Sequence, residues 1–209
     1  MISKSSLWVL AVAVLLSAAC AKRVVVEVPP RVDLYSYNLI GVVQFTTESK
    51  GSLAAFATQR FVEALQESQP GVRVLELGTA EDIKRTLQRN DLGFETMRAI
   101  GEKYKVGAVV VGVLDVQDVQ PRIDLQAMIT SGSVSADVKA ALTTKLLETA
   151  TGATVWTRST QTASTVAQVG VGKGGVRFDS QDPERAYGAM VDALVANLTQ
   201  DFRVSYVKQ

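Results

Sequence analysis

The run Ala108-Val109-Val110-Val111-Gly112-Val113-Leu114 is the most β-prone stretch of this 209-residue sequence. A nearly continuous apolar run of this length, rich in Val, is typical of a strand that is covered on both faces. Just upstream, residues 95–104 are expected to form a helix that leads through Val106-Gly107 into this strand. A helix that runs directly into a buried strand indicates an α/β fold with this strand near the centre of its sheet.

The chain before this strand alternates between strand and helix patterns. Residues 38–45, Asn-Leu-Ile-Gly-Val-Val-Gln-Phe, predict a second central strand, and residues 72–77 predict a third. Ser52 is placed to cap the helix between them. Thr79, with Asp82 three residues further on, begins another helix by an arrangement like a capping box.

The chain after this strand has a different pattern. Residues 122–130 and 134–147 each keep one face apolar, and residues 155–166 follow a turn at Gly152, which predicts an antiparallel meander. Asp182-Pro183 then opens a closing helix, with a cap followed by proline at the first helical position. The order is strand, helix, strand, helix, helix, strand, then a β-meander and a C-terminal helix. The predicted fold class is therefore α/β, a mixed β-sheet with helices packed on it.

Residues 1–19 have the pattern of a secretion signal peptide. Lys4 supplies a positive charge, residues 7–16 are an apolar run, and small residues precede Cys20. A spanning helix needs about 20 apolar residues, roughly twice this run, so a permanent membrane span is the weaker alternative.

The segment Leu16-Ser17-Ala18-Ala19-Cys20 resembles the lipobox of bacterial lipoproteins, with Ser17 where that family usually has Leu. The resemblance implies signal cleavage between Ala19 and Cys20 and attachment of fatty acid, such as palmitate, to Cys20. It also implies sorting to the outer membrane, because Ala21 rather than Asp follows the cysteine. Cys20 is the only cysteine, so an internal disulfide is impossible and a free thiol is the remaining alternative.

Residues 20–37 are predicted to be the lipidated cysteine and an extended tether. Pro29 and Pro30 fix their own φ and bias Val28 away from helix, so this segment can reach roughly 55 Å at about 3.3 Å per residue. The alternative is that the valines of residues 24–28 pair as an edge strand. Residues 38–209 are then expected to form a single α/β periplasmic domain.

Three segments carry a wider resemblance: the strand at residues 40–45, the helix-to-strand passage at 99–112, and the Thr151-Gly152 hairpin ahead of Val155-Trp156. Over about residues 34–205 the chain resembles the periplasmic α/β domain of curli-secretion-channel lipoproteins and the amino-terminal domain of the translocation protein TolB. The same domain recurs in lipoprotein activators of penicillin-binding proteins and in flagellar and exopolysaccharide accessory lipoproteins. The resemblance implies a partner-binding domain, which in several relatives forms a ring.

The composition excludes several classes of function. The chain has 22 Lys and Arg against 21 Asp and Glu, and the leader holds only Lys4, so the mature chain is formally neutral and a nucleic-acid partner is not expected. Histidine is absent, which removes the commonest general base and metal ligand, and the single cysteine is assigned to the anchor. We therefore expect no catalytic residue, no metal site and no cofactor.

Two local patterns resemble ligand sites but have simpler interpretations. Asp115, Asp118 and Asp124 match the spacing of no calcium loop and Pro121 interrupts them, so they indicate a solvated strand end. A phosphate loop needs a helix immediately after the glycines, but Val176-Arg177-Phe178 follow Gly170 to Gly175 and the next helix opens only near Pro183, so this segment is interpreted as a loop.

Three aromatic residues are the candidate partner surface: Tyr35, Tyr37 and Trp156. Trp and Tyr are common anchors of binding, although ordinary packing is the alternative for each. The expected function is that of a non-enzymatic lipoprotein on the periplasmic face of the outer membrane, an accessory of envelope assembly or secretion. It would act by binding envelope proteins, and a ring homo-oligomer is one candidate form. The alternatives are a monomeric regulator of a cell-wall synthase and a small-ligand carrier.

Overall fold

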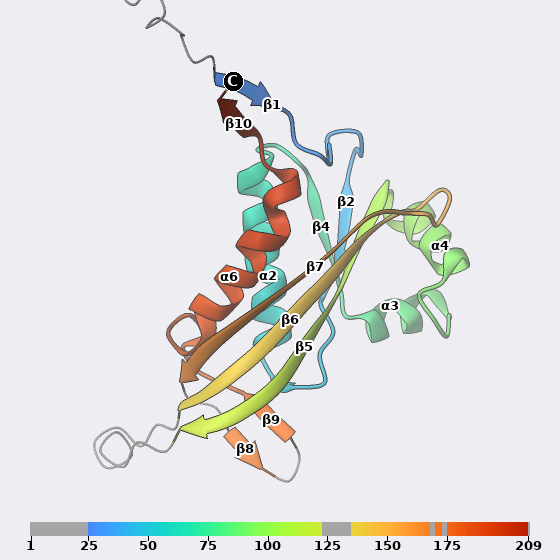
Figure 1. Ribbon diagram of the computed structural model, residues 1–209. Coiled ribbons are helices and arrows are strands. Elements are labelled where there is room, and N and C mark those ends of the chain that lie inside the picture. Colours follow the sequence, from blue (N-terminus) through green and yellow to red (C-terminus); the bar gives the residue numbers. More distant parts are fainter. Residues whose placement is uncertain (1–24, 123–134, 168–169, 173–174, 209) are drawn as a thin grey trace, which may run out of the picture. The chain divides into compact units, whose positions relative to one another are not determined.

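The computed structural model describes residues 25–122, 135–167, 170–172 and 175–208, and these divide into two units (Figure 1). The larger unit is Pro30–Arg203. The smaller unit holds strand β1 (Val25–Val28), which pairs antiparallel with β10 (Ser205–Lys208). Residues 1–24, and with them Ala19 and Cys20, lie outside the described residues.

The larger unit is organised around one mixed sheet in the order β4-β2-β5-β6-β7. Its members are β4 (Val74–Gly78), β2 (Ile40–Val43), β5 (Ala108–Arg122), β6 (Ser135–Glu148) and β7 (Thr154–Ala167). β2 pairs parallel with both β4 and β5, whereas β5, β6 and β7 form an antiparallel meander. The predicted α/β fold with a mixed sheet is confirmed.

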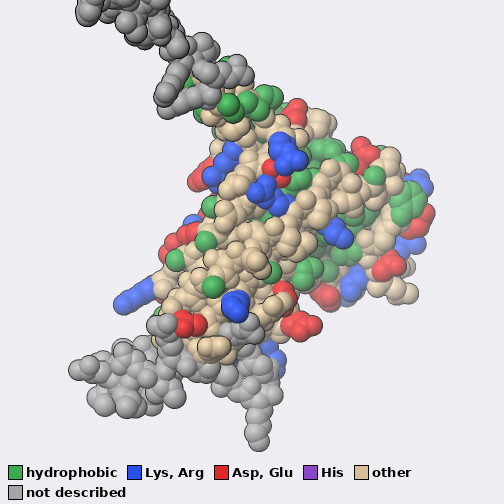
Figure 2. Space-filling view, viewed as in Figure 1, with side chains coloured by type: hydrophobic (Ala, Val, Ile, Leu, Met, Phe, Trp, Pro, Cys, Tyr) green, Lys and Arg blue, Asp and Glu red, His purple; other side chains and the backbone are tan. Residues whose placement is uncertain are grey.

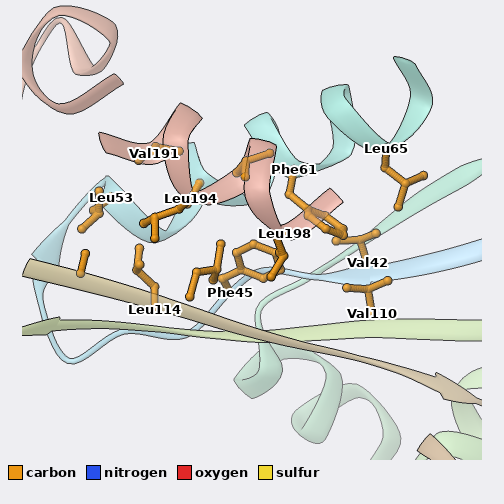
Figure 3. Close-up of a cluster of buried hydrophobic side chains, with 14 of the residues drawn as sticks. Val42, Phe45, Leu53, Phe61, Leu65, Val110, Leu114, Val191, Leu194 and Leu198 are labelled. Atoms are coloured by element: carbon orange, nitrogen blue, oxygen red, sulfur yellow. The ribbon is translucent and has the colours of Figure 1, made fainter. Parts of the chain in front are cut away.

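One face of this sheet is covered along its length by two helical segments (Figure 3). The first is α2 (Leu53–Ser68), and the second runs from the π-helical turn η1 (Glu184–Gly188) through α6 (Ala189–Leu198) to the 3-10 turn η2 (Thr199–Phe202). Phe61 of α2 packs against Phe45 with ring centroids 5.4 Å apart, and Leu194 and Leu198 of α6 lie in the same cluster. These contacts form the main hydrophobic core.

The opposite face is covered only where the strands are parallel. There α3 (Ala80–Leu87) and α4 (Phe94–Tyr104) bury a second cluster that includes Val43 and Val109 (Figure 1). Further along β5, Val113 on this face is 56% exposed. The molecule therefore has three layers at the parallel end and two layers along the meander.

Two local predictions about helix starts have different outcomes. The Thr79 cap is confirmed, because Thr79 Oγ1 accepts a hydrogen bond from the Asp82 N–H at 3.1 Å. Ser52 does precede α2, but its side chain makes no cap bond. Its hydroxyl instead contacts the hydroxyl of Tyr187 at 2.7 Å and the carbonyl of Phe178, so it links α2 to the C-terminal third of the chain.

The domain boundary differs from the prediction, because residues 32–34 belong to the folded unit. Leu34 is fully buried, and its N–H donates to Gln69 Oε1 at 2.9 Å. The Gln69 amide in turn donates to the carbonyls of Val32 (2.7 Å) and Phe202 (3.1 Å). The larger unit thus begins at Pro30 rather than at residue 38, and Val25–Val28 is a paired strand, the alternative to a free tether.

The long strand β5 is a second correction. Two strands were predicted at residues 108–114 and 122–130, but β5 continues through Pro121 to Arg122, and residues 123–134 lie outside the described residues. β2 pairs with β5 only as far as Val110, followed by an isolated bridge at Val113. Pro121 is tolerated in β5 for two reasons. It lies near the register shift at Gln117/Gln120, and on the side of β5 away from β6 no described strand pairs with this part of β5, so the missing N–H is not needed there.

Two smaller elements complete the unit. β8 (Gly170–Gly172) and β9 (Gly175–Phe178) pair antiparallel, and β9 also pairs with the short β3 (Lys50–Gly51). The glycine-rich segment predicted to be a loop therefore contributes two strand segments, and residues 173–174 between them lie outside the described residues. In the part of the chain that the structure describes, no helix has the length and hydropathy needed to span a membrane.

Candidate functional site

The meander presents one face that no described helix covers, which we call the open face. It consists of the side chains of β5, β6 and β7 that point away from α2 and α6, from the row of Val113 onwards, beyond the part of this face that α3 and α4 cover. The register aligns them in rows across the three strands: Val113, Thr143 and Ser159; Asp115, Ala141 and Gln161; Gln117, Lys139 and Ala163. The open face is polar because these positions alternate with the buried apolar positions of the same strands.

Small side chains hollow the open face. Ala141 and Ala163 line a depression of about 420 Å³ together with Gln117, Lys139 and Gln161. A neighbouring depression of about 380 Å³ continues along β6 and β7 towards Asp137 and Thr165. Figure 2 shows that most of the surface over the strip formed by these strands is backbone or side chains that are neither charged nor hydrophobic. The open face is therefore a shallow polar trough.

Hydrogen bonds across the strands hold this surface in place. Thr143 and Ser159 share a hydroxyl-to-hydroxyl bond of 2.8 Å, and the Thr165 hydroxyl donates to Asp137 at 2.6 Å. Within β5, the Gln117 amide donates to the carboxylate of Asp115, two residues earlier on the same strand. Pairs of this kind stabilise the sheet and also fix the side chains that a ligand would meet.

The free edge of β7 adjoins the open face. β7 is 14 residues long and ends the order of the sheet, so no other described strand pairs with its outer edge. Within Thr154–Ala167 there is no proline and only one charged residue, Arg158, which lies on the face towards the helices. The opposite edge strand, β4, is only five residues long and carries Glu76. Natural edge strands are usually protected by charges, proline or short length, and β7 has almost none of these.

Trp156 was predicted as a partner residue, but the structure places it in the core. It is only 8% exposed, its ring lies 4.7 Å from that of Phe202, and its indole N–H donates to Asp201 Oδ2 at 3.1 Å. Arg158 and Arg31 pair with the other oxygen of Asp201, at 2.8 Å and 3.3 Å. Trp156 therefore joins β7 to the end of the last helical segment, and it offers little surface to a partner.

The Asp201 carboxylate is electrostatically stabilised by this cluster. Burial acts to raise the pKa of Asp201, but the hydrogen bonds from Trp156 and Arg158 and the charges of Arg158 and Arg31 outweigh burial. The net result is a pKa below the ordinary value of 3.8. A carboxylate held ionised between two arginines and an indole has a structural role, because all of its partners belong to the same domain.

The two tyrosines of the predicted surface make no ring contact with Trp156 or with each other. Tyr35 is 57% exposed, and its hydroxyl donates to the carbonyl of Pro70 at 2.8 Å. Tyr37 is half-buried and packs beside Gly107. Burial, and then the charge of Glu148, raises the pKa of Tyr37. The structure does not bring the three aromatic residues together, so of this set Tyr35 alone remains an exposed aromatic.

The remaining perturbed groups also have structural explanations. The Thr79 hydrogen bond is the main reason that the pKa of Asp82 is lowered, and burial is the main reason that the pKa of Tyr187 is raised. Among the described residues there is no group of three or more side chains suited to hold a metal ion. Asp115 lies exposed on the open face beside Gln117, the side chain of Asp118 is not described, and Asp124 lies outside the described residues.

Sequence reasoning missed the open face as a site, although its signal was present. The positions 137, 139, 141, 143 and 145 of β6 are small or polar, and so are the exposed positions of β7 apart from Val155. A strand with one apolar face and one polar face indicates cover on one side only. The trough itself depends on which small residues lie side by side, and this requires the register.

Comparisons with known proteins give similarity of fold only. No family model matches the sequence, and no curated protein matches it. The chain is similar to several solved bacterial proteins, one of which is named as a lipoprotein. The PelC dodecamer from Paraburkholderia phytofirmans is 12% identical, with a TM-score of 0.47, and the match covers 87% of this chain and 97% of that one.

Two further solved structures have lower TM-scores. The LpoB C-terminal domain from Salmonella enterica is 17% identical, with a TM-score of 0.38 and coverage of 72% of this chain and 91% of that one. Lipoprotein GNA1162 from Neisseria meningitidis is 14% identical, with a TM-score of 0.37 and coverage of 61% and 83%.

Proposed function

We propose that this protein is a non-enzymatic lipoprotein, anchored in the outer membrane through Cys20, that binds other envelope proteins along the β7 edge and the open face. The observation that carries the proposal is the length and lack of protection of the β7 edge. A row of unpaired backbone N–H and C=O groups over 14 residues is a template for strand addition.

The surroundings of this edge suit a binding role. The helix-facing side of β7 is fixed by Trp156 and by Arg158, which bonds to Gln200 and Asp201. The edge is therefore rigid before a partner arrives, and binding costs little conformational entropy. The adjoining trough, with Ala141 and Ala163 at its base, accepts the side chains of an added segment. Main-chain bonds would supply affinity and the trough would supply selectivity.

The proposal has two forms, which differ in the protein that pairs with the β7 edge. If the partner segment is a different element of a second copy of the chain, the contact is head-to-tail, and its repetition can close a ring, the form that the family resemblance implies. If it comes from another envelope protein, the chain is a monomeric regulator. Light scattering after size exclusion of residues 21–209 distinguishes them: one defined large oligomer supports the ring, and a clean monomer supports the regulator.

The interaction surface is tested with a matched pair of variants. Gln161→Lys places a charge on the exposed side of β7, whereas Gln66→Lys makes the same change on the exposed face of α2. We expect Gln161→Lys to reduce self-association or partner binding at least tenfold and Gln66→Lys to leave it unchanged. Equal behaviour of the two variants would remove β7 from the proposal.

The anchor has its own test. Fatty-acid labelling and membrane fractionation are compared for the full chain and for Cys20→Ser in a diderm bacterium. The proposal predicts that label and outer-membrane location are both lost in the variant. An unlabelled wild-type chain that is soluble in the periplasm would contradict the anchor while leaving the β7 surface open to the previous test.

A further inference from the structure

The small unit formed by β1 and β10 carries an unusual concentration of exposed apolar side chains. The five large hydrophobic residues of its two strands, Val25, Val26, Val28, Tyr206 and Val207, are between 36% and 67% exposed. A two-stranded ribbon has no second layer of its own against which such residues can pack. The ribbon therefore has apolar area that no described residue of this unit covers.

The register divides this ribbon into two unlike faces. Val26 lies opposite Val207 and Val28 lies opposite Ser205, so one face carries no charged residue. On the other face Glu27 lies opposite Tyr206, and Val25 is opposite Lys208. Directly opposed residues share a face in an antiparallel pair, and successive residues alternate between faces. The ribbon is consequently amphipathic, with an uncharged valine face formed by Val26, Val28 and Val207.

The position of the ribbon in the chain indicates what this face meets. Five Cα steps separate Cys20 from Val25, so the ribbon begins at most about 18 Å from the acylated cysteine, even when the connecting chain is fully extended. The connecting residues include Lys22 and Arg23, and basic residues close to a bilayer are attracted to anionic lipid headgroups. Charge and chain length both hold the ribbon near a lipid surface.

We infer that the uncharged valine face of the β1/β10 ribbon lies on the membrane surface as a second contact beside the lipid anchor. This inference rests on the proposed lipidation of Cys20. Partial burial of apolar side chains at the interface removes the exposed area that the ribbon otherwise leaves in water. The chain after Cys20 then does not act as a free tether, because its first strand is held at the surface together with β10.

A fluorescent reporter on this face tests the inference in the anchored protein. Val207→Trp is prepared as full-length lipidated chain, reconstituted in vesicles of phosphatidylethanolamine and phosphatidylglycerol, and exposed to lipids with brominated acyl chains. Val155→Trp, on an exposed position of β7, is the matched control, and buried Trp156 gives the same background in both. We expect quenching of at least twofold at position 207 and none above background at position 155.

A second variant keeps the test independent of the reporter. Adding Val26→Asp to Val207→Trp puts a charge directly opposite the reporter on the same face, and this should abolish the quenching. If the labelled, anchored chain shows no quenching at 207, the membrane contact is refuted while the anchor stands. Quenching that is the same with and without Val26→Asp, or the same at 155 and 207, would also refute it. Failure of the anchor itself is detected separately by the absence of fatty-acid label.

Discussion

The change Trp156→Phe examines the link between the meander and the last helical segment. Phe keeps an aromatic ring near Phe202, whose ring centroid lies 4.7 Å from that of Trp156, but removes the indole N–H that donates to Asp201 at 3.1 Å. A hydrogen bond to a charged group contributes about 1.5–3 kcal/mol. Since Arg158 and Arg31 still pair with the carboxylate, Asp201 is not left uncompensated, and we expect a loss near the lower end of this range.

Trp156→Ala supplies the comparison, because it removes the ring as well. Truncation of a buried Trp typically costs about 3–5 kcal/mol, so the alanine variant should be clearly less stable than the phenylalanine variant. Urea unfolding of residues 21–209 measures the stability of both variants. The transition is monitored by circular dichroism, because the substitutions remove the tryptophan fluorophore. With a slope of about 2 kcal/mol per molar urea, Trp156→Phe should lower the midpoint by roughly 0.7–1 M.

The same assay contains the result that would refute this reasoning. If the free energy of unfolding of Trp156→Phe lies within about 0.5 kcal/mol of that of the wild type, the hydrogen bond from the indole to the carboxylate does not contribute measurably to stability. A cycle with Asp201→Asn tests the same bond from the other side, and residues in direct contact should show a coupling free energy of about 0.5–3 kcal/mol. Additive losses would mean that the two residues act separately.

Three further predictions concern the scaffold of the site. The pKa of Asp201 is lower in the folded chain than its ordinary value of 3.8. The contribution of this carboxylate to the free energy of unfolding is therefore fully present above about pH 4 and is lost as the pH falls through the folded pKa. Urea titrations at several pH values should show that the stability difference between wild type and Asp201→Asn shrinks below pH 4. Gly112→Ala should destabilise the domain by about 1–3 kcal/mol, because the added Cβ would lie 2.5 Å from the buried ring of Phe45, and an unchanged thermal midpoint would show that the ring moves aside freely. Thr79→Ala should cost about 1 kcal/mol in the same assay through loss of the cap bond to Asp82, whereas Thr79→Ser should retain most of it.

The architecture could be predicted from sequence because most elements have strong local patterns. Ile40–Val43 and Ala108–Val111 are apolar on successive positions, as strands covered on both faces must be, and the structure buries the first completely. The Thr79 cap depends on only four consecutive residues, so it too could be recognised locally. These features are determined by residues that are neighbours in the chain, so they can be recognised from the sequence alone.

The features in which the structure departs from the sequence-based expectation depend on contacts between distant residues. The role of Trp156 is decided by Asp201 and Phe202, which are more than forty positions away along the chain. Pro121 was interpreted as an interruption, since nothing in the sequence shows that β5 has an unpaired side at that point. The burial of Leu34 likewise depends on Gln69, whose amide ties residues 32–34 to the domain.

The binding surface was the least predictable part, because it is defined by what is absent from one side of the sheet. The polar positions of β6 and β7 can be identified in the sequence. Their pattern is equally consistent with a face that polar helices cover and with a face that is left open. Only the placement of α3 and α4 at the parallel end of the sheet decides between them. The trough between Ala141 and Ala163 follows from that placement and from the register.

Site-specific photo-crosslinking in living cells tests the central claim most directly. A photoreactive amino acid is placed at Gln161, on the exposed side of β7, and in a second strain at Gln66 on α2, in the full-length lipidated chain. The account predicts discrete protein adducts at position 161, reduced by a lysine at the neighbouring exposed position Ser159, and none at position 66. No adduct at 161, or the same adducts at both positions, would contradict the assignment of the β7 edge as the binding surface.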